Sequence, residues 1–292
     1  MKKPYIKYIA ALLLFGSNGI IASHISLTSY EIVLSRTLIG SIFLIAVYVI
    51  GKNKPRFLKD RKTVLYLLIS GTAMGANWLF LYEAFRQIGV SISTLACYCG
   101  PVILIVLAPM VFKEKLTSAK LIGIVSVFVG MFLVYGAELM SRGFSWGLVF
   151  GLLSALMYPI MVIFNKKAKN VSGSENSMSQ LVVAFFLVAV FTLIKDGAVL
   201  SIPKNSIVPI LFLGIFNTGI GCYMYFSSIH VLPAHSVAIC GYLEPLSALG
   251  FSALFLHERL TVVQLIGAFL VLGGAAFAEL FNTGKNKLAE IS

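Results

Sequence analysis

The sequence repeats part of itself at a constant offset of 144 residues. The stretch 90–130 aligns without a gap on the stretch 234–274, so that proline, glycine, tyrosine and glutamate recur in step. Shared hydrophobicity alone would not hold such a register. The chain is therefore predicted to be a doubled unit, with halves at residues 1–142 and 143–292. The aligned pairs include Tyr98 and Tyr242, Pro101 and Pro245, Glu114 and Glu258, Gly123 and Gly267, and Gly130 and Gly274.

Both halves are too apolar to cover a globule in water. Hydrophobic residues make up 59% of the chain and charged residues 12%, and the mean hydropathy is +0.94, which leaves too few polar side chains for a soluble surface. A helix needs about 20 apolar residues to cross a bilayer. The sequence therefore predicts an all-α integral membrane protein with ten transmembrane helices. Their ranges are 5–22, 30–50, 64–85, 91–112, 119–135, 144–164, 178–194, 207–229, 234–256 and 261–281.

The basic residues predict how these helices are oriented. Most Lys and Arg lie in connections on the side of the N-terminus, which places both termini in the cytoplasm by the positive-inside rule. Each half has an odd number of spans, so the second half enters from the opposite side and the repeats are inverted. The first run follows Lys2 and Lys3 and could be a signal peptide. We expect a retained helix, because ten spans divide into two fives and nine would not.

Neither the net charge of +12 nor the four cysteines indicate a binding site. Basic chains often bind nucleic acid, but here the Lys and Arg occupy short connections, so we expect no nucleic-acid partner. Cys97 and Cys99 would point to nearly opposite sides of a helix and could not share an ion. We expect no metal and no cofactor. The sequence contains no phosphate-binding loop, so we expect no nucleotide to be bound and hydrolysed.

Short motifs around the aligned prolines carry a family resemblance. The first half contains Pro101, Lys113-Glu114-Lys115-Leu116-Thr117 and Leu121-Ile122-Gly123. The second half contains Leu243-Glu244-Pro245, His257-Glu258-Arg259-Leu260-Thr261 and Leu265-Ile266-Gly267. This doubled pattern resembles the EamA-type carriers of the drug/metabolite transporter superfamily over nearly the whole chain. The resemblance implies two inverted five-helix EamA repeats in the bacterial cytoplasmic (inner) membrane, a central cavity, and export or exchange of small organic metabolites such as amino acids.

Glu244 is the first candidate for substrate binding. A charge at that depth costs on the order of 3 kcal/mol on insertion scales, so an intramembrane carboxylate is functional by default. It could bind a substrate ammonium group, carry a coupling proton, or form a structural hydrogen bond between helices. Its counterpart in the other half is Gly100. Pro101 and Pro245 each free a backbone carbonyl and predict either a paired hinge or two packing kinks.

Arg36 has two interpretations. It could face a substrate carboxylate, or it could extend to the outer interface beside Glu31; its counterpart is Gln180. The other candidates are polar and aromatic side chains at helical spacing, which would suit the wall of a site for a small organic molecule. They are Asn77, Trp78, Tyr82, Tyr98, Asn217, Tyr225 and Tyr242, with Asn18 and Tyr158 as weaker additions. Glu83 and Arg86 predict an outer salt bridge, and Glu114 and Glu258 predict structural caps.

Together these features predict a secondary-active transporter, not an enzyme, that moves amino-acid-like metabolites by alternating access. The resemblance favours export, and a proton is the candidate coupling ion. The alternatives are an uptake permease or exchanger for a small cationic or zwitterionic metabolite, a channel, and a lipid-modifying membrane enzyme, for which clustered His and Asp are missing. The expected partners are a small-molecule substrate and the lipid bilayer. Gly71 and Gly75, four residues apart, could pack helices within the bundle or form a homodimer.

Overall fold

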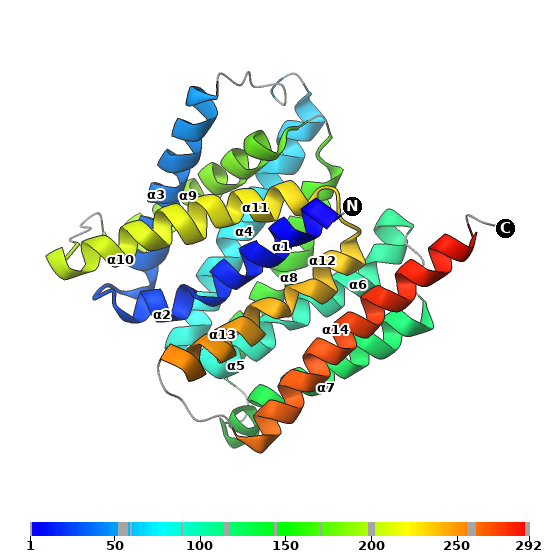
Figure 1. The fold of residues 1–292 in the computed structure, drawn as a ribbon. Coiled ribbons are helices and arrows are strands. Elements are labelled where there is room, and N and C mark those ends of the chain that lie inside the picture. Colours follow the sequence, from blue (N-terminus) through cyan, green and yellow to red (C-terminus); the bar gives the residue numbers. More distant parts are fainter. Residues whose placement is uncertain are drawn as a thin grey trace.

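The computed structural model describes residues 2–51, 58, 60–88, 90–113, 117–142, 145–169, 171–197, 202–255 and 261–289. The described chain is helical and contains no strand, which confirms the all-α prediction (Figure 1). Glu114 and Glu258 lie outside these residues. The helices of the first half are α1 (Lys2–Gly16), α2 (Asn18–Ser23), α3 (Ser29–Ile50), α4 (Arg61–Ile88), α5 (Val90–Cys97), α6 (Cys99–Phe112) and α7 (Ser118–Arg142). Those of the second half are α8 (Trp146–Lys167), α9 (Gly173–Asp196), η2 (Lys204–Ser206), α10 (Ile207–Phe212), η3 (Leu213–Ile220), α11 (Gly221–Ile229), α12 (Ala234–Gly241), α13 (Leu243–Phe255) and α14 (Val262–Ala289).

Among the described residues, seven helical segments are long and apolar enough to cross a membrane. Three further apolar helices are shorter, and these are Cys99–Phe112, Ser118–Leu133 and Val262–Gly274. The expected count of ten spans stays a prediction. Several runs that were expected to be continuous are interrupted. Breaks fall at Ser17 between α1 and α2, at Tyr98 between α5 and α6, and at Tyr242 between α12 and α13.

The run from 204 to 229 also departs from a regular α-helix, because its middle section, η3, is π-helical. π-helical turns are rare and often occur at functional sites. The wider turn is supported from within by Thr218, whose Oγ1 donates to the Leu213 carbonyl at 2.9 Å. Gly214 lets α3 pack directly on this section, since a Cβ there would lie 2.6 Å from the Ile39 side chain. Asn217 and Thr218 therefore lie on an irregular section of helix, which the 3.6-residue periodicity of the sequence does not predict.

Helices α7 and α14 pack side by side at one edge of the molecule (Figure 1). A Cβ on Gly130 would lie 2.6 Å from the Gly267 carbonyl oxygen, and one on Gly274 would lie 2.9 Å from the Gly123 carbonyl oxygen. Position 123 therefore faces 274 while 130 faces 267, so the two helices are antiparallel. At the offset of 144 residues, position 130 corresponds to 274 and position 123 to 267, so the two contacts are counterparts of each other.

Replacing Gly130 by alanine should lower the melting temperature of the protein. The added methyl group would meet a backbone oxygen, which cannot rotate aside, and such overpacking typically costs about 1–3 kcal/mol. Gly273→Ala is the matched control on the same helix pair, because a Cβ there meets nothing within 4 Å. Scanning fluorimetry in detergent compares the two variants. Equal melting temperatures would contradict the close approach.

The remaining helices of the two halves are interleaved. Helix α1 packs against α11 and α13, while α4 packs against α8 and α9; Figure 1 shows α1 running beside α11 across the face of the bundle. The main apolar core accordingly takes its side chains from both halves. Its largest fully buried members are Tyr8, Leu12, Leu104, Ile105, Leu181, Phe226, Ile229 and Ile239. Any site at the centre is therefore built by both halves.

Candidate functional site

The two helix breaks that correspond between the halves lie against each other at the centre. Tyr98 and Tyr242 occupy these breaks, with φ and ψ of −75° and 4° and of −69° and −7°. The Tyr242 hydroxyl donates to the Tyr98 carbonyl at 2.8 Å, and the rings lie 5.9 Å apart. Pro101 and Pro245 are the third residues of the helices that follow, in a first turn where a missing N–H leaves no helical bond unmade. The interruption expected at the prolines thus lies three residues earlier, and their role as hinges stays a prediction.

Glu244 is the second residue of α13, next to the break at Tyr242. Its side chain is partly exposed although it stands near the middle of the bundle. The Tyr98 hydroxyl hydrogen-bonds its carboxyl group, and Arg36 is close enough for the two charges to interact. Cys222 of α11 lies near both Arg36 and Glu244. The carboxyl group predicted from the sequence is therefore approached by side chains from both halves.

The absence of a second carboxylate at Gly100 has a steric cause. A Cβ on Gly100 would lie 2.8 Å from the Ala155 carbonyl oxygen and 3.0 Å from the Tyr158 Cβ, so α8 occupies the space of any side chain. At the other break, α1 contacts the backbone of α13 through Gly16, whose Cβ would lie 2.9 Å from the Glu244 carbonyl oxygen. The Glu244 backbone is therefore held close against α1.

Arg36 projects from α3 into the same region and is 4% exposed. Its Nε donates to Thr218 Oγ1 at 3.0 Å, and its Cζ lies 4.8 Å from the centroid of the Trp78 ring. Stacking on an aromatic face stabilises a guanidinium group by about 0.5–2 kcal/mol. Arg36 is therefore held between Trp78 of the first half and Thr218 of the second half.

The alternative in which Arg36 extends to the outer interface beside Glu31 is wrong. Glu31 belongs to the capping box of α3, where its Oε2 accepts the Thr28 backbone N–H at 2.8 Å. Arg36 points instead to Trp78, Thr218 and Glu244. We call Arg36, Trp78, Tyr98, Thr218 and Glu244 the central cluster.

Three tyrosines lie beside the central cluster. The rings of Tyr8 and Tyr225 are 5.3 Å apart, and the hydroxyls of Tyr8 and Tyr158 each lie 3.6 Å from the position of a Cβ on Gly241. Tyr158 and Tyr225 both lie near Glu244. The buried Tyr158 hydroxyl has no hydrogen-bond partner at normal distance within the described chain. Tyr225 was predicted; Tyr8 was missed, because nothing in the first apolar run distinguishes it.

Asn77 and Asn217 bind backbone on neighbouring helices. Asn77 Nδ2 donates to the Ser154 carbonyl at 2.8 Å, and Asn217 Nδ2 donates to the Leu14 carbonyl at 2.7 Å. Donors and acceptors are both related by an offset of 140 residues, so these are corresponding contacts of the two halves. Asn217 also donates to Asn18 Oδ1 at 2.9 Å. Both asparagines thus bind one half of the chain to the other next to the cluster.

Tyr82 belongs to a different group of side chains. It packs with Tyr30, Val33 and Leu79 in a separate apolar cluster, and its ring lies 5.3 Å from that of Phe85. Trp78 of the central cluster also packs against this apolar cluster, so the two groups of side chains meet at Trp78.

A charged network lies near one end of α4 and α9. Glu83 accepts from Arg86 at 2.6 Å, which confirms the predicted salt bridge, and from Lys195 of α9 at 3.1 Å. The Tyr30 hydroxyl also donates to Glu83. At the other end of α9, Asn176 pairs with Asn165 of α8 at 2.8 Å. Polar contacts between helices therefore stand at both ends, with the central cluster between them.

The membrane-length helices and the charged cluster buried among them define a multi-pass membrane protein with a polar centre. The model of the EamA-like transporter family matches residues 2–136 and 145–280. The chain therefore belongs to the EamA-like transporter family, and the resemblance carried by the doubled motifs is confirmed.

Two relatives that are named as transporters are similar to most of the chain, and a solved structure shares its fold. The chain is 25% identical over 287 residues to "Uncharacterized transporter YxxF" of Bacillus subtilis (strain 168), covering 96% of this chain and 90% of that protein. It is 22% identical over 264 residues to "Uncharacterized inner membrane transporter YhbE" of Escherichia coli (strain K12), covering 85% and 82%. A solved structure titled "Crystal structure of protein" has a TM-score of 0.83 at 17% identity, covering 96% of this chain and 98% of that one, so the two share a fold.

Proposed function

We propose that the chain is a secondary-active transporter that exports amino-acid-like metabolites across the cytoplasmic membrane by alternating access. The observation that carries this proposal is the pair of opposite charges in the central cluster. Arg36 has Thr218 and Trp78 as partners, and Glu244 has Tyr98, so each charge is held by neutral side chains. A zwitterion could place its ammonium group at Glu244 and its carboxylate at Arg36, with the tyrosine rings around its side chain.

The packing of the two halves supports the alternating-access part of the proposal. Inverted repeats exchange an outward opening for an inward one when the halves exchange conformations. The antiparallel pair α7 and α14 and the corresponding contacts of Asn77 and Asn217 are those expected of such repeats. The networks around Glu83 and Asn176 would have to open in turn. We place both termini in the cytoplasm on the distribution of basic residues.

A thermal-shift comparison tests the substrate class. Purified protein is heated with a neutral amino acid, with its methyl ester, which lacks the carboxylate, and with its N-acetyl derivative, which lacks the amine. A ligand at a hundred times its dissociation constant stabilises the folded state by about 2.7 kcal/mol. We expect the free amino acid to raise the melting temperature most and both derivatives to raise it less.

Exchange in proteoliposomes then tests the mechanism. Unlabelled substrate inside the vesicles should accelerate uptake of labelled substrate, and the rate should saturate. A flux that does not saturate and ignores internal substrate would identify a channel. Stabilisation by none of a broad panel of amino acids would contradict the proposed substrate class.

A further inference from the structure

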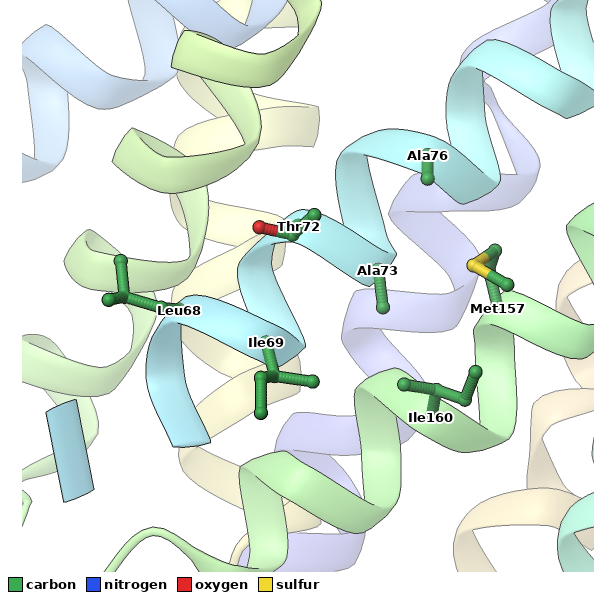
Figure 2. A pocket seen from close by; sticks show the side chains of 7 residues that line it. All are labelled: Leu68, Ile69, Thr72, Ala73, Ala76, Met157 and Ile160. Carbon is green, nitrogen blue, oxygen red and sulfur yellow. The ribbon is translucent and has the colours of Figure 1, made fainter. Parts of the chain in front are cut away.

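A groove runs along the outer surface of the bundle between α4 and α8, away from the central cluster. Its volume is about 320 Å³, within the range of small-molecule sites in proteins. Figure 2 shows Ile69 and Ala73 of α4 opposite Met157 and Ile160 of α8. The lining is apolar except for the Thr72 hydroxyl. Such a surface in a membrane protein fits a hydrocarbon chain.

The walls of the groove continue along both helices to basic side chains. On α4, residues 69, 66 and 62 follow one another at spacings of three and four, which places Tyr66 and Lys62 on the face of Ile69. On α8, residues 160, 164 and 167 do the same. The rings of Tyr66 and Phe164 meet across the two helices at 5.7 Å. The Lys167 Nζ lies 5.6 Å from the centroid of the Phe164 ring.

Basic residues from both helices gather at this end of the groove. Arg61, Lys62, Lys167 and Lys169 are all exposed. The Thr63 hydroxyl joins the two segments, since it lies 2.9 Å from the Lys169 carbonyl and 2.7 Å from the Asp60 carboxylate. That hydrogen bond from Thr63 lowers the pKa of Asp60, which therefore stays charged. One carboxylate against four cations leaves the end of the groove strongly positive.

We propose that this groove binds an anionic phospholipid, with one acyl chain between α4 and α8 and the phosphate between Lys62 and Lys167. The apolar lining fits the chain, Tyr66 and Phe164 stand where aromatic side chains favour the boundary between chain and headgroup, and ammonium groups form strong hydrogen bonds to phosphate oxygens. The charge distribution places this end in the cytoplasm, where the leaflet carries anionic lipid. A lipid bound here would support the contact between α4 of the first half and α8 of the second.

Native mass spectrometry of delipidated protein tests the site. Phosphatidylglycerol and phosphatidylcholine with the same acyl chains are titrated in turn. We expect phosphatidylglycerol to bind more tightly, and Lys62→Gln with Lys167→Gln to weaken it roughly thirtyfold, because each lysine near a membrane surface contributes about a factor of five. Binding of phosphatidylcholine should change little. The double variant Lys3→Gln with Lys204→Gln removes the same charge from exposed positions away from the groove and should bind as the wild type does.

Ala73→Phe tests the apolar part separately, since the ring would fill the groove while both lysines remain. It should weaken both lipids, and melting temperatures without lipid show whether the variant folds. Equal affinity of the wild type for the two lipids would overturn the proposal. Unchanged affinity for phosphatidylglycerol in the lysine double variant would also overturn it. If Ala73→Phe abolished a dimer while lipid binding persisted, the groove would be a contact between two copies of the chain, and the proposal would again be overturned.

Discussion

Replacing Glu244 by glutamine should abolish exchange of an amino acid in proteoliposomes. The amide has nearly the volume of the carboxyl group and still accepts a hydrogen bond from Tyr98, but it cannot pair with an ammonium group. Removing one partner of a desolvated charge pair typically costs about 2–5 kcal/mol, which corresponds to a loss of roughly thirtyfold to several thousandfold in affinity. If Glu244 carries a coupling proton as well, the dependence of the rate on an imposed pH gradient should also disappear.

Two further variants separate the charge of Glu244 from the fold. Glu31→Gln removes a carboxylate that is not part of the central cluster, and glutamine still suits the capping box of α3, so exchange should continue. Glu244→Asp keeps the charge and should retain part of the activity. An unchanged exchange rate and pH dependence in Glu244→Gln, with protein of normal melting temperature, would remove Glu244 from the mechanism.

The asymmetry at position 244 could be read from the sequence, because the repeat allows each half to be compared with the other. Glu244 aligns with Gly100, so the carboxylate is an addition to one half. The reason for the asymmetry could not be read, since it depends on the 2.8 Å approach of the Ala155 carbonyl oxygen to the position of a Cβ on Gly100. Local pattern gives the position of a residue along a helix. Which backbone lies against it depends on tertiary packing.

Asn77 and Asn217 also show that the sequence does not reveal which group a side chain contacts. Asn77 and Asn217 were predicted as binding residues because they lie on polar stripes with aromatic neighbours. An amide donates equally well to a ligand or to a backbone carbonyl, and here each uses its Nδ2 on a carbonyl of the other half. The π-helical section that carries Asn217 could not be predicted from the sequence either, because over two turns an apolar run is equally compatible with an α-helix and with a π-helix.

Thr218 was missed for a related reason. It is a lone threonine in an apolar run, and its hydroxyl gains its role from Arg36, 182 residues away. No local pattern in the sequence singles out Thr218. Its role follows from the fold, which brings Thr218 and Trp78 to the same guanidinium group.

Replacing Arg36 by glutamine should weaken the binding of ligands that carry a carboxylate. Within the described chain, only the Nε of Arg36 has a hydrogen-bond partner, so the other guanidinium N–H groups can donate to a planar carboxylate in the paired geometry that arginine favours. A loss of about 2–5 kcal/mol would lower affinity for an amino acid by a factor of thirty or more. Arg36→Lys keeps the charge without the paired donors, and its affinity should be intermediate.

The decisive measurement compares two ligands on each variant. An amino acid and the amine that lacks its carboxylate are tested by thermal shift, and only the amino acid should bind Arg36→Gln more weakly than the wild type. Gln180→Met is the matched control, because Gln180 corresponds to Arg36 in the other half and its buried amide has no partner among the described residues. Equal losses for both ligands in Arg36→Gln would show that Arg36 acts by holding Trp78 and Thr218 in place. A loss confined to the amino acid would assign the carboxylate to Arg36 and leave the ammonium group to Glu244.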